Sequence, residues 1–398
     1  MKVLFLSNLF PDAHEPNRGN YNAQLLKHLS KHCEIRVLSP RATRGFPPFW
    51  FPKKLVRREQ DALFAPVYPP AAYVPKVGSR VNHLLMARSV ETALRNIRDE
   101  FPFDVVLTSW IYPDACATAE LARRNNFPFV AIAQGSDVHQ YLRMPTRRKI
   151  ITTSLNLASA VVTRSQELKR QLIEAGVRNG TIHTIYNGVD SKIFSPTEKS
   201  LARKQIGLPD NSTVFLFVGN FLPIKNPLFL VEAHAAFCRN QPEKKSILVM
   251  IGTGPLRDSV KERSRMLGTG DMFLLVGAKS SREVALYMQA ADLLCVPSDN
   301  EGLPNVILEA FACGLRVVAR KVGGIPEIVA DDSLGELVDG NDPQKMAVAM
   351  ARVSASPVQP AKIQTHVRRF SWETTAELYF ALLDTARSTS NLAKKVGA

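Results

Sequence analysis

Cysteine is scarce in this sequence, and no two cysteines stand close together. The five residues of this type are an odd number, and none forms a Cys-X-X-Cys pair. These features exclude a disulfide framework and a cysteine-rich zinc site. Because several cysteines lie in apolar runs, as Cys295 does after Leu293 and Leu294, we expect buried free thiols in a reducing compartment.

The chain also lacks a long apolar run. No stretch approaches the roughly 18 apolar residues that a membrane-spanning helix needs. The opening residues, MKVLFLSNLFP, are short and strand-like, and Asp12 follows them at once, so we expect no signal peptide. The sequence therefore predicts a cytoplasmic protein, with peripheral contact at the inner face of the cell membrane as a further option.

Acidic residues are scarce in the first half of the chain. Residues 1–205 contain 30 Lys and Arg against 16 Asp and Glu, whereas residues 206–398 contain 21 against 20. The net charge of +15 is thus concentrated in the first half. We expect an acidic partner to meet that half, such as anionic lipid headgroups, a lipid pyrophosphate or nucleic acid.

Aromatic and basic residues gather in the proline-rich segment 41–60. This mixture suits a membrane interface, and nucleic acid can use it too. No RNA-binding signature accompanies it, so we do not expect a nucleic-acid partner. Membrane or acceptor contact and a loop with its aromatic side chains packed inward both remain open. The candidate contact residues are Phe49, Trp50, Phe51, Lys53 and Lys54.

The length of 398 residues suits two domains rather than one core. Apolar strands alternate with amphipathic helices, beginning with a strand over 2–6, a loop with Gly19 and a helix over 21–32. This order predicts an α/β fold of doubly wound parallel sheets. Pro196, Gly207 and Pro209 mark residues 191–212 as a linker. The expected domains are residues 1–205 and 206–370, and the tail 387–398 is expected to fray.

The most informative stretch runs from Pro297 to Glu327. A turn-rich loop precedes a helix that we expect from Asn305 to about Cys313, with Gly314 ending it. A strand over 316–320 and a second glycine turn follow. Free backbone N–H groups and the helix dipole in such a loop favour an anion.

Two glutamates of this stretch suit a ligand with hydroxyl groups. Glu301 lies in the loop and Glu309 lies eight residues on, in the expected helix. Eight residues are about 80° past two full helical turns, so the two carboxylates can flank one elongated ligand. Carboxylates accept hydrogen bonds, and a sugar offers pairs of hydroxyl donors.

The segment EGLPNVILEAFACG, followed by GGIPE, resembles the signature of the retaining glycosyltransferases of family 4, group 1. The resemblance covers residues 1 to about 388, strongly in the second half and loosely in the first, and looks most like bacterial exopolysaccharide or teichuronic-acid assembly enzymes. It implies the GT-B fold, which has two Rossmann-like domains facing a deep cleft. It also implies that a C-terminal helix over 371–388 crosses back to the first domain.

On that resemblance the second domain binds a nucleotide-diphosphate sugar. Lys225 neutralises the leaving phosphate, Glu309 accepts from the ribose hydroxyls and Glu301 accepts from the sugar hydroxyls. Asn220 stands where the family has an arginine, which removes a bidentate phosphate contact. The other residues expected around the donor are Gly254, Gly277, Gly302, Leu303, Pro304 and Asn305.

Three residues of the first half match the family's site in part. Gly19 corresponds to a loop glycine that lets the backbone approach the donor phosphate, although it also suits a plain turn. Gln134 stands where a histidine usually faces the donor sugar, and an amide cannot titrate. Asp137 matches and is a candidate for orienting a sugar or an acceptor.

The resemblance implies a retaining hexosyl transfer that needs no metal and no cofactor. The sequence agrees in having no Asp-X-Asp pair placed to hold a metal, since Asp331 and Asp332 lie in a later loop. We expect transfer from a UDP-sugar, or next a GDP-sugar, to a lipid-linked or saccharide acceptor in cell-surface polysaccharide biosynthesis. Two alternatives stay open: a nucleotide-sugar epimerase or hydrolase, and a non-catalytic nucleotide-sugar-binding scaffold, which Gln134 and Asn220 favour.

Overall fold

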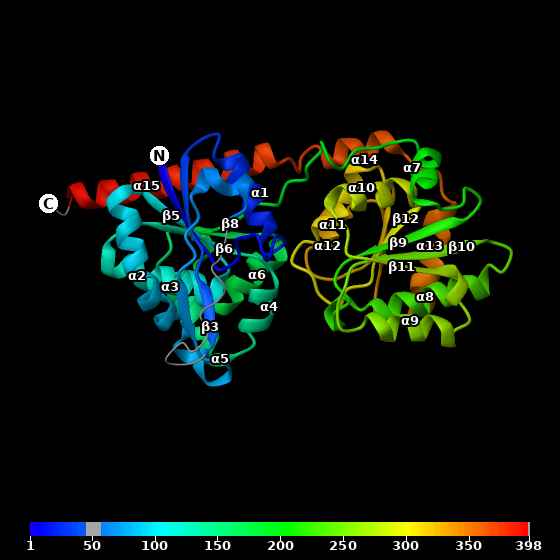
Figure 1. Ribbon diagram of the computed structural model, residues 1–398, viewed down its shortest axis with the longest axis horizontal. Coiled ribbons are helices and arrows are strands. Elements are labelled where there is room, and N and C mark those ends of the chain that lie inside the picture. The colour runs from blue at the N-terminus through cyan, green and yellow to red at the C-terminus, as the bar shows by residue number, and fades with distance from the viewer. Residues whose placement is uncertain (45–56, 397–398) are drawn as a thin grey trace. The chain divides into compact units, whose positions relative to one another are not determined.

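The computed structural model describes residues 1–44 and 57–396 (Figure 1). The chain divides into two compact units. The first unit is Met1–Asn187 together with Trp372–Ala398, and the second unit is Gly188–Ser371. Each unit is a parallel β-sheet with helices on its faces, so the predicted α/β fold of two Rossmann-like domains is confirmed.

The sheet of the first unit has six parallel strands in the order β2-β1-β5-β6-β7-β8. Apolar, buried runs form the central strands, as expected for a sheet that is covered on both faces, whereas the edge strands β2 and β8 include polar residues. The strands are β1 Lys2–Leu6, β2 Glu34–Leu38, β5 Val105–Ser109, β6 Phe129–Ala133, β7 Ala160–Thr163 and β8 Ile182–Thr184. A separate parallel pair is formed by β3 Arg41–Arg44 and β4 Pro70–Tyr73.

Helices cover both faces of this sheet (Figure 1). They are α1 Asn20–Leu29, α2 Asn82–Glu100, α3 Cys116–Asn125, α4 Ser136–Tyr141, α5 Pro145–Leu155, α6 Gln166–Ala175 and α15 Trp372–Val396. Helix α15 packs beside α1, and its buried residues Trp372, Ala376, Tyr379 and Leu383 join the core on that face. The expected return of the C-terminal helix to the first unit is therefore confirmed.

The sheet of the second unit has six parallel strands in the order β11-β10-β9-β12-β13-β14. The strands are β9 Thr213–Val218, β10 Ser246–Ile251, β11 Phe273–Gly277, β12 Leu293–Val296, β13 Val317–Arg320 and β14 Gly335–Val338. The helices are α7 Lys199–Ile206, α8 Pro227–Asn240, α9 Arg257–Met266, α10 Ser281–Ala290, α11 Asn305–Ala312, α12 Ile325–Ile328, α13 Pro343–Ala355 and α14 Pro360–Val367.

The boundary between the units differs from the expected one. It lies at Asn187 and Gly188 rather than after residue 205. The expected linker contains α7, whose buried Arg203 donates to the carbonyl oxygen of Ala290 at 3.0 Å and to Asp292 at 2.7 Å. These bonds attach the segment to the second unit.

The C-terminal tail also differs from its prediction. Helix α15 continues to Val396 instead of ending near Ala386. Residues 387–396 contain no glycine or proline, so nothing in the sequence stops the helix there.

All five cysteines are free thiols, as the sequence predicts. Four are buried, and Cys238 is partly exposed. Over the ranges that the structure describes, none of the helices combines the length and the apolar character that crossing a bilayer requires.

Candidate active site

The second unit gathers its expected site residues where the strand order reverses. Strands β9 and β12 lie side by side, and the chain leaves them toward opposite halves of the sheet. Ligands of open α/β sheets bind at the carboxyl ends of the strands at this switch point. Lys225 ends a short turn, Pro223–Lys225, that follows β9, and Glu301 lies in the loop that follows β12.

Lys225 and Glu301 form an ion pair in this loop region. Nζ of Lys225 lies 2.6 Å from Oε1 of Glu301, and the hydroxyl of Ser298 donates to the same oxygen at 2.7 Å. The Glu301 side chain is only 10% exposed, whereas that of Lys225 is 31% exposed. The lysine is therefore held in a fixed place while its ammonium group still meets solvent.

The two sequence motifs of this region pack directly against each other. Gly323 has φ of 53°, and a Cβ added there would lie 1.7 Å from the carbonyl oxygen of Glu301. The backbone N–H of Gly324 donates to the carbonyl oxygen of Gly302 at 3.1 Å. Only glycine fits at residue 323, so the GGIPE turn determines where the backbone of the Glu301 loop runs.

Helix α11 starts in the same loop. Pro304 is its N-cap residue, with no side-chain cap and no acidic residue in the first turn. Leu303 and Pro304 are buried, while Gly302 and Asn305 are partly exposed. No carboxylate in the first turn of α11 therefore compensates the positive end of the helix dipole. An uncompensated helix N-terminus favours an anionic ligand.

Glu309 lies further along α11. Burial raises the pKa of this carboxyl to about 7. Among the described residues no cation pairs with it, and its side chain retains some exposure. A carboxyl in this state can accept from a ligand hydroxyl once it is ionised.

The remaining expected donor residues follow the ends of the neighbouring strands. Asn220 is exposed after β9, and Gly277 ends β11 with φ of 74° and open space beside it. Gly254 is different, because a Cβ there would lie 2.7 Å from the carbonyl oxygen of Phe221. Close packing of two loops accounts for this glycine.

The first unit has its own switch point, between β1 and β5. Gly19 precedes α1 with φ of 60°, and a Cβ there would lie 2.2 Å from the carbonyl oxygen of Leu9. Close loop packing and the left-handed backbone both require glycine at this place.

Asp137 has a structural role that the sequence does not reveal. Its carboxylate is fully buried and accepts from four backbone N–H groups, those of Ile111, Gln134, Gly135 and Val138, at 2.8–3.1 Å. Burial raises its pKa despite these bonds. The carboxylate therefore positions the loop after β6 rather than facing a ligand.

Gln134 is held at both ends of its amide. Its Nε2 donates to Oγ of Ser109 at 2.7 Å and to Oδ1 of Asn22 at 3.4 Å. Its Oε1 accepts from Nε of Arg164 at 3.2 Å. The arginine is 1% exposed, and its Nη2 has no hydrogen-bond partner within the described ranges.

Arg164 is a residue that the sequence analysis misses. Its one sequence signal is a charge directly after the apolar strand β7. Among the described residues no carboxylate pairs with this buried guanidinium, which makes its burial costly. It also donates to the carbonyl oxygen of Ile185 at 3.5 Å and lies over the ring of Tyr379 at 5.6 Å. The bond to Gln134 leaves that amide with one fixed orientation and a second oxygen lone pair for a ligand.

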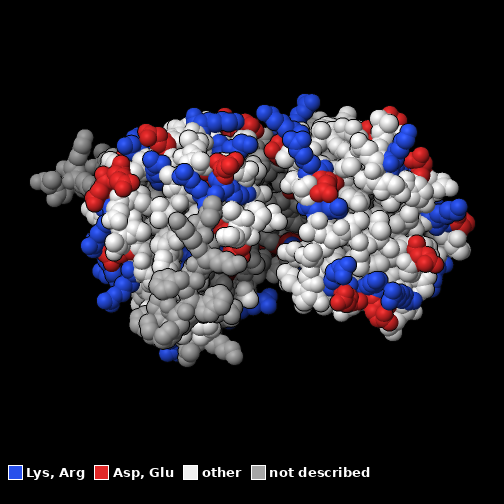
Figure 2. Space-filling model, viewed as in Figure 1, with Lys and Arg blue, Asp and Glu red and all other residues white. Residues whose placement is uncertain are grey.

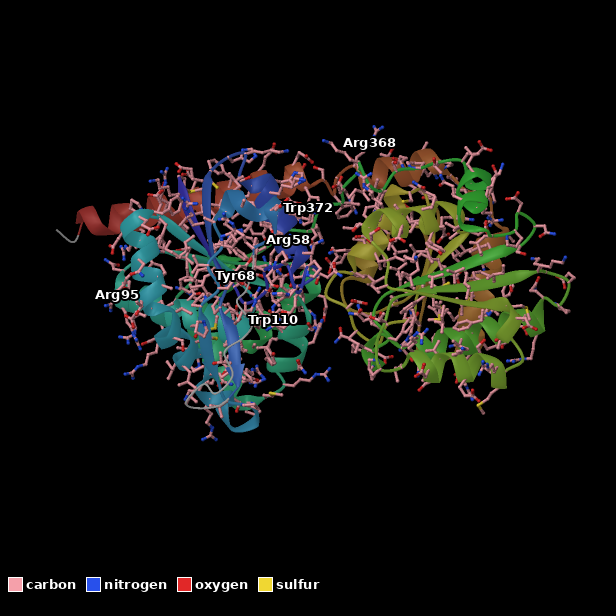
Figure 3. The ribbon with its side chains drawn as sticks, viewed as in Figure 1. Arg58, Tyr68, Arg95, Trp110, Arg368 and Trp372 are labelled. Carbon is pink, nitrogen blue, oxygen red and sulfur yellow. The ribbon has the colours of Figure 1, made fainter. Side chains whose placement is uncertain are left out.

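A cavity of about 240 Å³ opens at the switch point of the first unit. Its lining includes Asn8 after β1, Trp110 after β5, Tyr73, Tyr141 and Arg18. Trp110, labelled in Figure 3, has φ of 87°, which L-residues rarely adopt, and such strain gathers at ligand sites. Aromatic walls with a few polar groups suit a sugar or polyol ring.

The five expected membrane-contact residues, Phe49, Trp50, Phe51, Lys53 and Lys54, lie outside the described residues. In the second unit, the structure brings together Lys225, Glu301 and the start of α11. In the other unit it brings together Gln134, Ser109 and Asn22.

Both halves of the chain match known protein families. Residues 198–370 match the family model described as glycosyl transferases group 1, and residues 19–192 match the model of glycosyltransferase family 4. The protein belongs to glycosyltransferase family 4, group 1. Both halves of this family 4 protein are matched, so the resemblance seen in the sequence is confirmed for the family.

Curated relatives of this glycosyltransferase family member carry one recurring name. The chain is 34% identical over 257 residues to D-inositol 3-phosphate glycosyltransferase 2 of Catenulispora acidiphila, covering 62% of this chain and 60% of that protein. It is 30% identical over 296 residues to the D-inositol 3-phosphate glycosyltransferase of Nocardiopsis dassonvillei, covering 71% and 67%. The chain thus spans about three-fifths of the length of the first of these relatives.

Solved structures share the fold over nearly the whole chain. Sucrose-phosphate synthase from Thermosynechococcus elongatus is 22% identical with a TM-score of 0.76, covering 98% of this chain and 99% of that one. Anabaena HepE, solved in complex with UDP, is 21% identical with a TM-score of 0.74, covering 97% and 100%. At this identity the likeness establishes the GT-B fold of this family 4 protein.

Proposed function

We propose that this protein is a retaining glycosyltransferase that moves a sugar from a nucleotide-diphosphate sugar to a lipid-linked or saccharide acceptor in cell-surface polysaccharide synthesis, without a metal ion. The observation that carries the proposal is the Lys225–Glu301 ion pair, which joins the turn after β9 to the loop that leads into α11. The fold neighbour HepE binds UDP in its solved complex, which supports a UDP-sugar as the donor.

The second unit supplies groups for the departing nucleotide. When the bond between the anomeric carbon and the phosphate oxygen breaks, negative charge develops on the diphosphate. The ammonium group of Lys225 and the positive end of α11 stabilise that charge, which is electrostatic catalysis by preorganised groups. Glu309 accepts from the ribose hydroxyls.

Glu301 has two tasks in this mechanism. Before the donor binds, its carboxylate holds Lys225 at 2.6 Å. Once the donor is bound, its oxygens accept from hydroxyls of the sugar, and Lys225 turns to the phosphate. The acceptor oxygen then forms the new bond on the face from which the nucleotide leaves, and the acceptor's proton passes to the phosphate oxygen. No protein base is needed for this step.

The acceptor has a second candidate, a phosphorylated polyol. The relatives are named for inositol 3-phosphate, and the fold neighbour is named for sucrose phosphate. The small aromatic-lined cavity of the first unit suits one such ring. A lipid-linked acceptor instead rests on the basic excess of residues 1–205, which also favours peripheral contact with an anionic membrane.

A donor and acceptor panel in the presence of EDTA tests the proposal. UDP- and GDP-sugars are each offered with a lipid extract, with inositol 3-phosphate or with no acceptor, and nucleotide release and product anomer are measured. The proposal expects one donor to be used, an acceptor to raise its turnover, and the anomeric configuration to be kept. An inverted product would overturn retention, and loss of turnover in EDTA would overturn metal independence.

A further inference from the structure

A basic groove lies on the second unit beside the edge strand β11. The groove encloses about 380 Å³ and is lined by three cations of α9, Arg257, Lys261 and Arg265, and by Phe273 and Leu275 of β11, with Asp271 as its acidic residue. Lys and Arg side chains are visible along the lower margin of the unit that carries α9 (Figure 2). None of the residues lining the groove has a place in the proposed transfer reaction.

The three cations share one face of α9. They recur every four residues, so their side chains follow one another along the helix. Among the described residues, Arg257 pairs with Asp258 at 3.6 Å and Arg265 with Glu262 at 3.8 Å, and both ion pairs are long and exposed. Within the described ranges no carboxylate pairs with Lys261. The lining of the groove thus carries three cations against the one carboxylate of Asp271, while Asp258 and Glu262 are exposed neighbours that screen Arg257 and Arg265 only weakly.

Strand β11 borders this groove and has an open edge. Within the part of the chain that the structure describes, β11 pairs with β10 on one side and with no strand on the other. An unpaired edge presents a row of backbone N–H and C=O groups that a further strand can use. Leu274, on the opposite face of β11 from Phe273 and Leu275, is 38% exposed.

We propose that this groove binds an extended, acidic segment of a partner protein, which adds to the edge of β11 as a seventh strand. The spacing of the groups supports this occupant. Four residues of helix rise by about 6 Å, and alternate residues of a strand lie about 6.6 Å apart. Acidic residues at every second position of the added strand thus meet successive cations of α9.

The same geometry defines the other face of the added strand. The residues between the acidic ones point to the opposite face, where Leu274 is exposed, so apolar side chains suit them. A phosphate group alone would satisfy the cations but would leave the strand edge unpaired. An alternating acidic and apolar sequence is the chemistry that fits both features.

The test uses the full-length protein and a synthetic peptide of alternating glutamate and valine. A peptide of the same composition with its glutamates in one block, and one of alternating lysine and valine, are the controls. We expect the alternating acidic peptide to bind most tightly and to slow amide hydrogen exchange across Phe273–Gly277. Equal binding of the block peptide, or binding without slower exchange in β11, would overturn strand addition.

Charge-reversal variants distinguish binding at this groove from non-specific attraction of the peptide to a basic protein. The variant Lys261→Glu/Arg265→Glu should weaken peptide binding by at least about tenfold, because each attraction becomes a repulsion. Lys244→Glu, an exposed lysine elsewhere in the unit, should leave it unchanged. Both variants should keep the nucleotide-release activity of the parent. Equal loss in both variants, or tighter binding of pyrophosphate or anionic vesicles than of the peptide at this groove, would contradict the proposal.

Discussion

Nζ of Lys225 lies 2.6 Å from Oε1 of Glu301, although 76 residues separate the two in the chain. The pair joins the loop after β9 to the loop after β12, at the switch point of the second sheet. On the proposed function, an anionic ligand at this place would compete with Glu301 for the lysine. We therefore expect the carboxylate to have opposite effects on nucleotide binding and on turnover.

The first prediction concerns that competition. Glu301→Gln removes the negative charge and keeps the shape, so Lys225 is released to a diphosphate. We expect the affinity for UDP to rise by roughly two- to fivefold, because a change of that size corresponds to the free energy of one partly exposed ion pair. Turnover should fall. Isothermal calorimetry measures the first effect and nucleotide release the second. Weaker binding of UDP by this variant would show that Glu301 does not compete for the lysine.

The second prediction concerns pH. Burial raises the pKa of Glu309 to about 7, so the carboxyl loses its charge as the pH falls through that value. Accepting from ribose hydroxyls is best done by the carboxylate. We expect UDP affinity to fall by roughly tenfold from about pH 8 to about pH 6. The Glu309→Gln side chain cannot titrate, so its UDP affinity should depend less on pH, with only the titration of UDP itself remaining. Equal slopes of affinity against pH in the parent and the variant would show that Glu309 does not bind the nucleotide as a carboxylate.

The same carboxyl also gives a stability prediction. Its pKa is higher in the folded state than in the unfolded chain, so the folded state binds the proton more tightly. The contribution of Glu309 to stability is present below its unfolded pKa and is lost as the pH rises through about 7. Glu309→Gln should therefore gain stability relative to the parent at high pH, as chemical denaturation would measure. A gain only at low pH would have the wrong sign.

The third prediction concerns Gly323. An added Cβ would meet the carbonyl oxygen of Glu301 at 1.7 Å, so Gly323→Ala must move the Glu301 loop. We expect donor turnover to fall by more than about tenfold while the unit stays folded, because the contact lies in surface loops. Gly268→Ala, where φ is 73° and nothing lies within 4 Å of an added Cβ, is the matched control. Unchanged kinetics in Gly323→Ala would mean that the loop is not fixed by this packing.

The fourth prediction concerns Arg164 and Gln134. If the arginine positions the amide, the two act as a unit, and their substitutions are not additive. We expect Gln134→Ala, Arg164→Met and the double variant to lower donor turnover by a similar factor. Thermal unfolding checks folding, and removal of a buried charge with an unpartnered Nη2 should cost little stability or raise it. Multiplying effects in the double variant would assign the residues separate roles.

The regular parts of the fold could be predicted from the sequence because the central strands of both sheets are short apolar runs. The first strand, predicted over 2–6, is observed as β1 Lys2–Leu6 for this reason. The start of α11 follows equally from Pro304 and its end from Gly314, since proline and glycine act locally. Glu301 and Glu309 could be predicted as site residues because both lie in one short motif, where their spacing is visible in the sequence.

Contacts between distant segments could not be predicted in the same way. The sequence singles out Lys225 and Glu301 separately, but not the ion pair between them. Asp137 looks like a ligand-facing residue because nothing local shows that four backbone N–H groups surround it. Residues 191–212 are predicted as a linker because of their proline and glycine residues, although the helix-forming residues between these form α7.

The most direct measurement is nucleotide release from a UDP-sugar panel in EDTA, for the parent protein and for Lys225→Ala, Glu309→Ala and the control Lys244→Ala. We expect release from one donor in the parent and the control. Turnover should fall by about a hundredfold or more in Lys225→Ala, as for the removal of a preorganised transition-state contact, and by less in Glu309→Ala. Tight binding of UDP with no release by the parent from any donor, with or without acceptor, would contradict the account and favour a non-catalytic nucleotide-sugar-binding protein.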